Sequence, residues 1–278
     1  MKIALGSLQA RHPAAAPGTA PVLRVEQLHV QAGELLAVIG PSGAGKTTLL
    51  QVLACALPPS AGTLRLDGVD PWAARPAELQ ALRRALFLAP QVPPLPPRQR
   101  VVTAVLAGRL PHESLWASLR SLFYPQDIPL AHRALAAFDL GDKLFERVDR
   151  ISGGERQRVG LARLLVAQAR LWLVDEPLSA LDPTRARQAL HTLTRMAQER
   201  GATLVATLHQ VDMALAYFPR IVGLRDGAVA FDLPAAEVTP ALLHALYAQH
   251  LDELSTAAPA SWMDAPAAAP APVVMHCR

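Results

Sequence analysis

The amino-acid sequence predicts an α/β fold built on a mostly parallel sheet with helices on both faces. Short apolar segments such as Leu171–Val174 alternate with amphipathic runs, a pattern typical of buried parallel strands. A glycine-rich segment at 40–45 separates an apolar strand from a helix. A long stretch without strand signals, about 92–165, interrupts the alternation, and we expect it to be a helical subdomain inserted into the sheet domain.

Composition bounds the class of protein. The chain has 278 residues, of which 51% are hydrophobic, enough for one α/β domain with a small appended subdomain. The formal net charge is +4, but no basic run exceeds two residues and no aromatics are interleaved with the basic ones. We therefore expect no nucleic-acid partner.

The cysteines and the apolar segments indicate the compartment. Cys55 and Cys277 form neither a disulfide framework nor a metal spacing, which fits a reducing cytosol. The N-terminal apolar stretch is too short for a signal peptide, and no apolar run is long enough to span a bilayer. A membrane role would therefore need a partner.

Elements of the N-terminal half follow from alternation and turn residues. Residues 1–21 end in an Ala/Pro-rich segment, and we expect them to form a loop region. The proline-rich segment Pro93–Pro97 resembles a ligand of SH3-like domains, but a stiff connector is the preferred interpretation. The predicted strands are Val22–Val30, Glu34–Ile39, Thr63–Leu66 and Ala85–Ala89, and the predicted helices are Lys46–Leu57 and Ala77–Arg84.

Elements of the C-terminal half are bounded by caps and turns. Residues 101–150 predict helices with polar breaks. Asp182-Pro183 starts a helix that runs to Arg200, where Gly201 stops it, and Asp226-Gly227 predicts a hairpin. Strands are predicted at Leu171–Val174, Thr203–Leu208, Ile221–Leu224 and Ala228–Phe231, and a last helix from Thr239-Pro240 to about Leu254. We divide the chain into a loop region at 1–21, a sheet domain at 22–254 and a disordered Ala/Pro-rich tail at 255–278.

A phosphate-binding loop is predicted between a strand and a helix, where the sequence fits G-x-x-x-x-G-K-[ST]. Its glycines let backbone N–H groups converge on phosphate oxygens, and the helix N-terminus adds partial positive charge. Lys46 would reach the β- and γ-phosphates of ATP, and the Thr47 hydroxyl would ligate Mg²⁺. A flexible glycine turn is the alternative, but this lysine is one of only three in the chain. The predicted nucleotide-binding residues are Gly40, Pro41, Ser42, Gly43, Ala44, Gly45, Lys46, Thr47 and Thr48.

Two carboxylates, Asp175 and Glu176, end the apolar strand Leu171–Val174. We expect Asp175 to hold Mg²⁺, directly or through water, and Glu176 to polarise the attacking water as a general base. The alternative is a strand end with two solvated acids. Their pairing with a phosphate loop favours ATP hydrolysis.

The run Ser152-Gly153-Gly154-Glu155 precedes a long helical segment. The pattern S-x-x-E is a capping box, and that is one interpretation. Two glycines at a helix start are costly unless the backbone must approach something closely, so a second anion site is the other. Two such helix starts can meet on one nucleotide only if two chains pair head to tail.

Taken together, these motifs resemble the ATP-binding subunits of ABC transporters over about residues 22–250. The phosphate loop, Ile151–Glu155, Asp175-Glu176, Ser179–Asp182 and His209 occur in that family's order. The resemblance implies a P-loop NTPase fold with an N-terminal antiparallel part and an inserted helical subdomain. It also implies a head-to-tail homodimer on ATP and integral-membrane permease partners.

The resemblance also implies roles for single residues. Ser152, Gly153, Gly154 and Glu155 would act in trans on the partner's nucleotide, and Asp182 would lie at the subunit contact. Gln91 would link Mg²⁺ and the attacking water to the helical subdomain. His209 would contact the γ-phosphate. The expected catalytic set is Glu176, His209, Gln91 and Lys46, and the expected metal set is Thr47, Gln91 and Asp175.

The sequence departs from the family in the signature, which is the Ile151–Glu155 run, and in the residue that stacks on adenine. Ile151 and Glu155 replace the more usual leucine and glutamine. No tyrosine, phenylalanine or tryptophan precedes Trp72, so the aromatic that stacks on adenine in the family is missing. Arg11 and His12 are the candidates to replace it.

Import ATPases for phosphonates are the members that the sequence resembles most. The run Leu208-His209-Gln210-Val211-Asp212 is the most telling stretch. The resemblance implies a peripheral place on the cytoplasmic face of the inner membrane and indirect work with a periplasmic or extracellular substrate-binding protein.

Other functions stay open at this point. An ATPase of another importer or of an exporter uses the same motifs. A soluble DNA-repair ATPase is less well supported, because the segment between Gln91 and Ser152 is short and has no cysteine. Within that segment, apolar residues of 115–124 form either a partner groove or the subdomain's own core.

Overall fold

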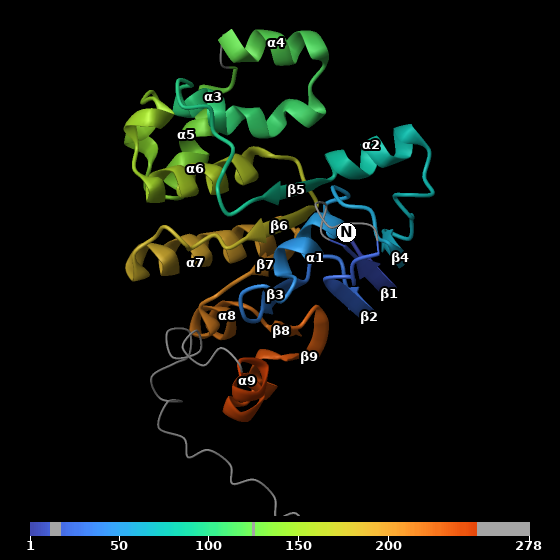
Figure 1. The fold of residues 1–278 in the computed structure, drawn as a ribbon. Helices are drawn as coiled ribbons and strands as arrows, with labels where there is room; N and C mark the ends of the chain where they lie inside the picture. The colour runs from blue at the N-terminus through green and yellow to red at the C-terminus, as the bar shows by residue number, and fades with distance from the viewer. Residues whose placement is uncertain (12–17, 124–125, 249–278) are drawn as a thin grey trace, which may run out of the picture.

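A single mixed sheet forms the centre of the molecule. The computed structural model describes residues 1–11, 18–123 and 126–248, and within them nine strands follow the order β4-β1-β2-β9-β8-β3-β7-β6-β5 (Figure 1). The strands from β8 to β5 in this order pair in parallel, whereas β1 pairs antiparallel with β2 and β4. The predicted fold class, a mostly parallel core with an antiparallel N-terminal part, is confirmed. The strands are β1 Ile3–Ala10, β2 Leu23–Val30, β3 Leu35–Ile39, β4 Ala61–Leu66, β5 Leu86–Ala89, β6 Leu171–Asp175, β7 Thr203–Thr207, β8 Arg220–Arg225 and β9 Ala228–Pro234.

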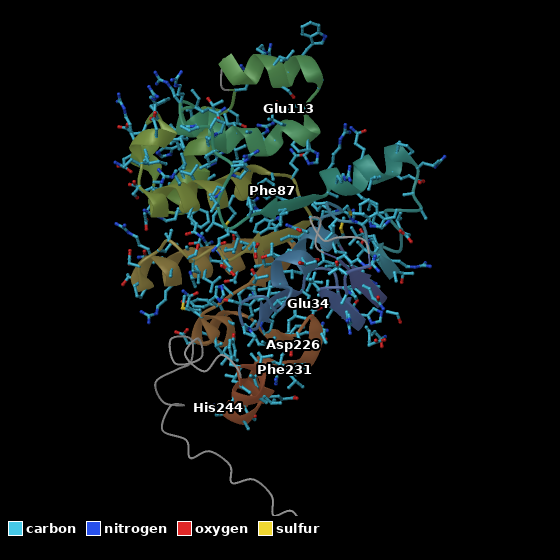
Figure 2. The ribbon with its side chains drawn as sticks, in the orientation of Figure 1. Glu34, Phe87, Glu113, Asp226, Phe231 and His244 are labelled. Carbon is cyan, nitrogen blue, oxygen red and sulfur yellow. The ribbon has the colours of Figure 1, made fainter. Side chains whose placement is uncertain are left out.

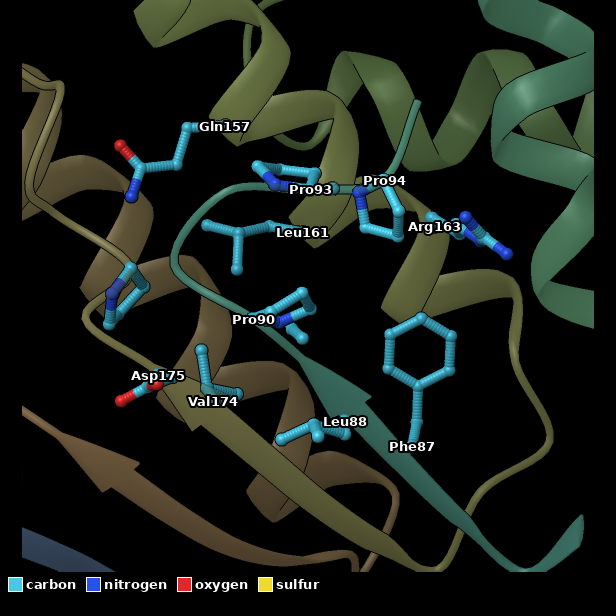
Figure 3. Close-up of a pocket in the computed structure, with 13 residues that line it drawn as sticks. Phe87, Leu88, Pro90, Pro93, Pro94, Gln157, Leu161, Arg163, Val174 and Asp175 are labelled. Carbon is cyan, nitrogen blue, oxygen red and sulfur yellow. The ribbon is translucent and has the colours of Figure 1, made fainter. Parts of the chain in front are cut away.

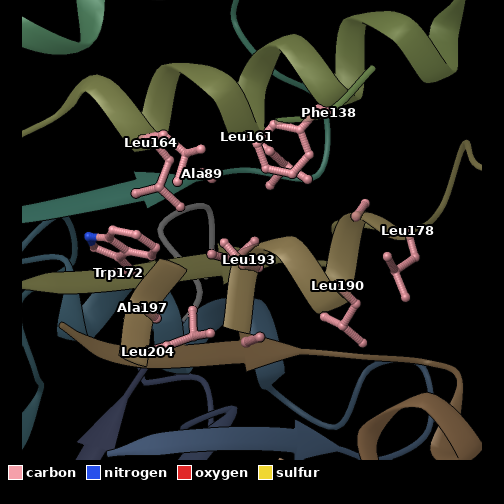
Figure 4. Packing of buried hydrophobic residues seen from close by; sticks show 14 of the residues in the cluster. Ala89, Phe138, Leu161, Leu164, Trp172, Leu178, Leu190, Leu193, Ala197 and Leu204 are labelled. Atoms are coloured by element: carbon pink, nitrogen blue, oxygen red, sulfur yellow. The ribbon is translucent and has the colours of Figure 1, made fainter. Parts of the chain in front are cut away.

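The parallel strands are apolar throughout because both sheet faces are covered. On β6, Leu171 and Leu173 belong to one buried cluster, and Trp172 and Val174 to the other. Figure 4 shows Trp172 beside α6 and α7, with its neighbours drawn from both helices. The indole is fully buried, and its Nε1 donates to the Ala169 carbonyl at 3.0 Å.

Helices rather than strands fill the region between β5 and β6, as the sequence predicts. Phe87 of β5 lies where the sheet meets these helices, and Glu113 precedes α4 (Figure 2). Among the described residues, no helix has the length and apolar character needed to cross a bilayer. The α-helices are α1 Lys46–Leu53, α2 Pro76–Arg84, α3 Val101–Leu106, α4 Leu115–Phe123, α5 Ile128–Ala136, α6 Gly153–Val166, α7 Pro183–Glu199, α8 Val211–Tyr217 and α9 Pro240–Leu246.

The expectation of a loop region over residues 1–21 is wrong for residues 3–10. They form β1, which lies between β2 and β4. Its register with β4 shifts between Gly6 and Gln9, and Ser7 adopts a φ of 45°. A bulge of this kind breaks the period-two alternation, and this explains why the sequence pattern missed the strand.

Three helix assignments also change. The first helix ends at Leu53 instead of Leu57, because Cys55 turns the chain at a φ of 53°. Helix α8 was not predicted. The last helix ends at Leu246, and the tail predicted at 255–278 lies outside the described residues.

Replacing Trp172 by alanine should lower the free energy of unfolding by about 3–5 kcal/mol, as for other buried aromatics. Urea denaturation measures it. Trp116, which is 82% exposed on α4, provides the matched control, and its alanine variant should change stability by no more than about 0.5 kcal/mol. Equal effects of the two replacements would contradict the burial described for Trp172.

Candidate functional site

The loop that joins β3 to α1 is shaped by glycines. Gly40 has a φ of 150°, and a Cβ there would lie 2.1 Å from the Leu224 carbonyl oxygen. Gly45 has a φ of 96° and adjoins the first residue of α1. Side chains at either position would strain the backbone, so the predicted loop geometry depends on these two glycines.

Lys46 is folded back over this loop. Its side chain is buried, and the Nζ donates to the carbonyl oxygens of Gly40 at 2.7 Å and of Pro41 at 3.1 Å. An ammonium held at a helix N-terminus adds to the positive potential of the helix dipole. The arrangement is suited to binding an anion.

A cavity of about 380 Å³ lies over the loop. Glu176 and His209 follow the neighbouring parallel strands β6 and β7, whose carboxyl ends meet at this edge of the sheet, where ligands of such folds bind. The volume suits a small-molecule ligand. Its lining is Val22, Ser42, Gly43, Ala44, Gly45, Lys46, Thr47, Thr48, Glu176 and His209.

Val22 is a lining residue that the sequence analysis missed, since it precedes β2 and carries no motif. Arg11, one of the two candidates to stack on adenine, is exposed and does not line the cavity. His12, the other, lies outside the described residues.

The Asp175 carboxylate joins α1 to β7. Its Oδ2 accepts from the Thr47 hydroxyl at 2.9 Å and its Oδ1 from the Thr207 hydroxyl at 2.6 Å. Thr47 and Asp175 are therefore adjacent, as the expected Mg²⁺ set requires. No three carboxylate, imidazole or thiol groups converge as a metal site anywhere in the described part of the chain. A hydroxyl and one carboxylate fit Mg²⁺, which takes its other ligands from phosphate and water.

Both oxygens of the Glu176 carboxylate are occupied. Oε1 lies 2.6 Å from Nε2 of His209, and Oε2 accepts from Nε2 of Gln91 at 2.8 Å. The hydrogen bond from His209 is the main cause that lowers the pKa of Glu176, against the opposing effect of burial. The carboxylate is therefore ionised and oriented near neutral pH. Gln91, expected at the metal, contacts Glu176 instead of Thr47 or Asp175 among the hydrogen bonds of the described residues.

The Glu176 backbone is held in an unusual conformation. Its φ is 46°, in the left-handed region, which is costly for a residue other than glycine. The Glu176 N–H donates to the Thr207 hydroxyl at 3.0 Å. Thr207 therefore supports both acids, a role that the sequence analysis did not assign. The sequence signal for this role was a hydroxyl side chain at the end of β7, the strand next to β6, which carries Asp175.

The Ser152–Glu155 run forms the capping box that the sequence allowed. The Glu155 N–H donates to Ser152 Oγ at 3.2 Å, and the Ser152 N–H donates to Glu155 Oε2 at 2.7 Å. The close approach occurs at Gly154, where a Cβ would lie 2.8 Å from the Ala180 carbonyl oxygen. Asp182 caps α7 by accepting from the N–H groups of Thr184 and Arg185.

The predicted site residues thus fall into two groups within one chain. The phosphate loop, Glu176 and His209 share one cavity, which Gln91 and Asp175 support together with Thr207, a residue that was not predicted. Among the described residues that line this cavity, none comes from 152–155, and Asp182 is not among them.

Comparison with known proteins identifies close relatives. A family model described as ABC transporter matches residues 23–179. A phosphonates import ATP-binding protein of Albidiferax ferrireducens is 74% identical over 278 residues, and one of Polaromonas sp. is 68% identical, each with 100% of both chains covered.

Solved structures show the same fold. A dimeric bacterial ABC transporter cassette has a TM-score of 0.72 at 24% identity, covering 84% of this chain and 98% of its own. A dimeric post-hydrolysis cassette bound to ADP and Pi has a TM-score of 0.71 at 23% identity, with the same coverage.

Replacing His209 by alanine removes the hydrogen-bond donor to the Glu176 carboxylate. We expect this change to move the acid limb of the pH–kcat profile of ATP hydrolysis to higher pH. In the parent protein His209 holds the pKa of Glu176 below 4.5. In His209→Ala, burial raises the pKa of the Glu176 carboxyl and only the smaller effect of the Lys46 charge still lowers it, so Glu176 is protonated at a higher pH. The His209→Gln variant, which keeps an N–H donor, is the control and should move the limb less. An unchanged limb in His209→Ala would argue against this contact.

Proposed function

This chain belongs to the ABC transporter family, and we propose that it is the ATP-hydrolysing subunit of an importer for phosphonates or related organophosphorus compounds. The observation that carries the proposal is the cavity in which the phosphate loop, Glu176 and His209 converge. Membership of the family makes the chain an ATPase coupled to transport. We propose, in addition, the roles of single residues, the transported compound and the partner proteins.

The chain's own groups divide the work of hydrolysis. Lys46 exchanges its two carbonyl partners for the β- and γ-phosphate oxygens. Thr47 and Asp175 would hold Mg²⁺, which would neutralise charge on the phosphates when bound. Glu176 polarises the attacking water, and His209 keeps that carboxylate oriented while it contacts the γ-phosphate.

A second copy completes the site in this proposal. Ser152, Gly153 and Gly154 present a helix N-terminus, which favours an anion, yet they do not line the cavity of their own chain. A head-to-tail homodimer brings them to the partner's γ-phosphate. Two relatives in fold are themselves described as dimeric.

The permease surface that we propose lies on α4. Trp116 is 82% exposed and Leu119 is 45% exposed, and both line a shallow depression with Arg120. The exposure of Trp116 and Leu119 favours a groove that binds a partner over a place in the subdomain's own core. The subunit would thus sit at the cytoplasmic face of the inner membrane and act with a substrate-binding protein outside it.

The assignment of phosphonate as the transported compound, or cargo, rests on the relatives. No residue of the site supports it. The ATPase subunit does not bind the transported molecule, so its fold alone does not select one. The relatives from Albidiferax ferrireducens and Polaromonas sp., which match over the whole chain, are both named for phosphonate import.

Head-to-tail pairing is tested by the molar mass of the Glu176→Gln protein, measured by light scattering with and without ATP. General-base loss should lower hydrolysis by about 10²–10⁴-fold and leave binding intact, so ATP should convert monomer to dimer. The control is the double variant that adds Lys46→Ala, which should stay monomeric because it loses the phosphate-binding charge. A mass unmoved by saturating ATP in Glu176→Gln would oppose the pairing.

Cargo is tested by growth on a phosphonate as sole phosphorus source. Deleting the gene should abolish growth on the phosphonate and leave growth on inorganic phosphate unchanged. The native gene should restore growth, and the Glu176→Gln gene should not. Normal growth of the deletion strain on phosphonates would overturn the cargo assignment while leaving the ATPase assignment in place.

A further inference from the structure

We infer that Gln157 is a positioning residue that couples the signature helix α6 to the loop that carries Glu176. The inference rests on the proposed function of Glu176 and extends it to a residue that touches neither nucleotide nor metal. Figure 3 shows Gln157 extending from α6 toward the chain that follows Asp175 at the end of β6.

The side-chain amide of Gln157 makes three hydrogen bonds to one loop. Nε2 donates to the Glu176 carbonyl oxygen at 2.9 Å and to Ser179 Oγ at 3.2 Å, while Oε1 accepts from the Ala180 N–H at 2.8 Å. Gln157 is only 4% exposed. A buried amide with three partners in fixed directions defines the position of that loop closely.

An independent contact joins the same two elements one turn earlier on the helix. The Cα of Gly154 packs against the Ala180 carbonyl, and an added Cβ would lie 2.8 Å from its oxygen. Residues 154 and 157 are spaced to share one helix face. Helix α6 therefore meets the 176–180 loop through backbone packing at its first turn and through hydrogen bonds at its second.

This junction links the two halves of the site described above. Ser152 caps the N-terminus of α6, and Glu176 begins the loop with its φ of 46°. When Ser152–Gly154 engage the partner's phosphate, a shift of α6 passes through Gln157 to the Glu176 carbonyl. Because Ser179 and Ala180 are held as well, the same shift reaches Asp182 at the expected subunit contact.

If Gln157 couples the two elements, loss of its hydrogen bonds should lower ATP turnover and ATP-driven dimerisation without weakening nucleotide binding. Gln157→Leu keeps the volume and removes all three hydrogen bonds. We expect kcat for ATP hydrolysis by the purified full-length chain to fall by about 10- to 100-fold, as for small misplacements of a reacting group. We expect the affinity of the monomer for ATP to stay within about twofold, because the phosphate loop is untouched.

Two further readouts separate positioning from simple destabilisation. In the Glu176→Gln background, Gln157→Leu should raise the ATP concentration needed for the dimer seen by light scattering. In Gln157→Glu, an ionised carboxylate still accepts from Ala180 but cannot donate, and a protonated one can. Its kcat relative to the parent protein should therefore rise as the pH falls from 8 to 6, since burial beside a carbonyl raises a carboxyl pKa.

Gln188→Leu on α7 is the matched control, because it makes the same replacement at an exposed helical glutamine. It should leave kcat and pairing unchanged. Folded fraction is checked by thermal unfolding, and kcat is expressed per folded molecule. A Gln157→Leu protein that is folded and retains kcat and ATP-driven pairing within twofold would overturn the inference. Unimpaired hydrolysis in Glu176→Gln would instead overturn the proposed function, so the two failures are distinguishable.

Discussion

The paired hydrogen bonds to Asp175 are the constraint on which the site depends. One carboxylate accepts from Thr47 at the start of α1 and from Thr207 at the end of β7. These bonds fix the phosphate loop against the central strands. Short charge-assisted bonds in a buried setting are strong and directional, so the positions of Lys46 and Glu176 follow from them.

Glu176 is the residue on which separate parts of the chain converge. Its side chain meets His209 from the loop after β7 and Gln91 from the connector after β5. Its backbone meets Thr207 on one side and Gln157 on the other. A left-handed backbone conformation in a residue other than glycine persists only where several contacts hold it in place. The hydrogen bonds of Glu176 provide these contacts.

Two glutamines connect the helical region to this carboxylate. Gln91 stands at the entry to the region and bonds the Glu176 side chain, whereas Gln157 stands near its exit and bonds the Glu176 carbonyl. A motion of the helices relative to the sheet therefore acts on Glu176, the general base that we propose, from both its side chain and its backbone. This is a physical route by which a surface such as Trp116 on α4 can communicate with hydrolysis.

The sequence by itself determined the fold class and the phosphate loop, because apolar periodicity and the G-x-x-x-x-G-K-T spacing are local signals. It also determined the strand end with Asp175 and Glu176. Only the tertiary structure decided that β1 is a strand, since its bulge hides the alternation and one of its two partners, β4, lies far along the chain. The same holds for the roles of Thr207 and Gln157, whose hydrogen bonds join segments distant in sequence and leave no local pattern. The hydrogen bond from Gln91 to Glu176 was likewise decided by the tertiary structure, because side-chain direction is set by packing and not by motif order, and the role of Gln91 at the metal stays a prediction.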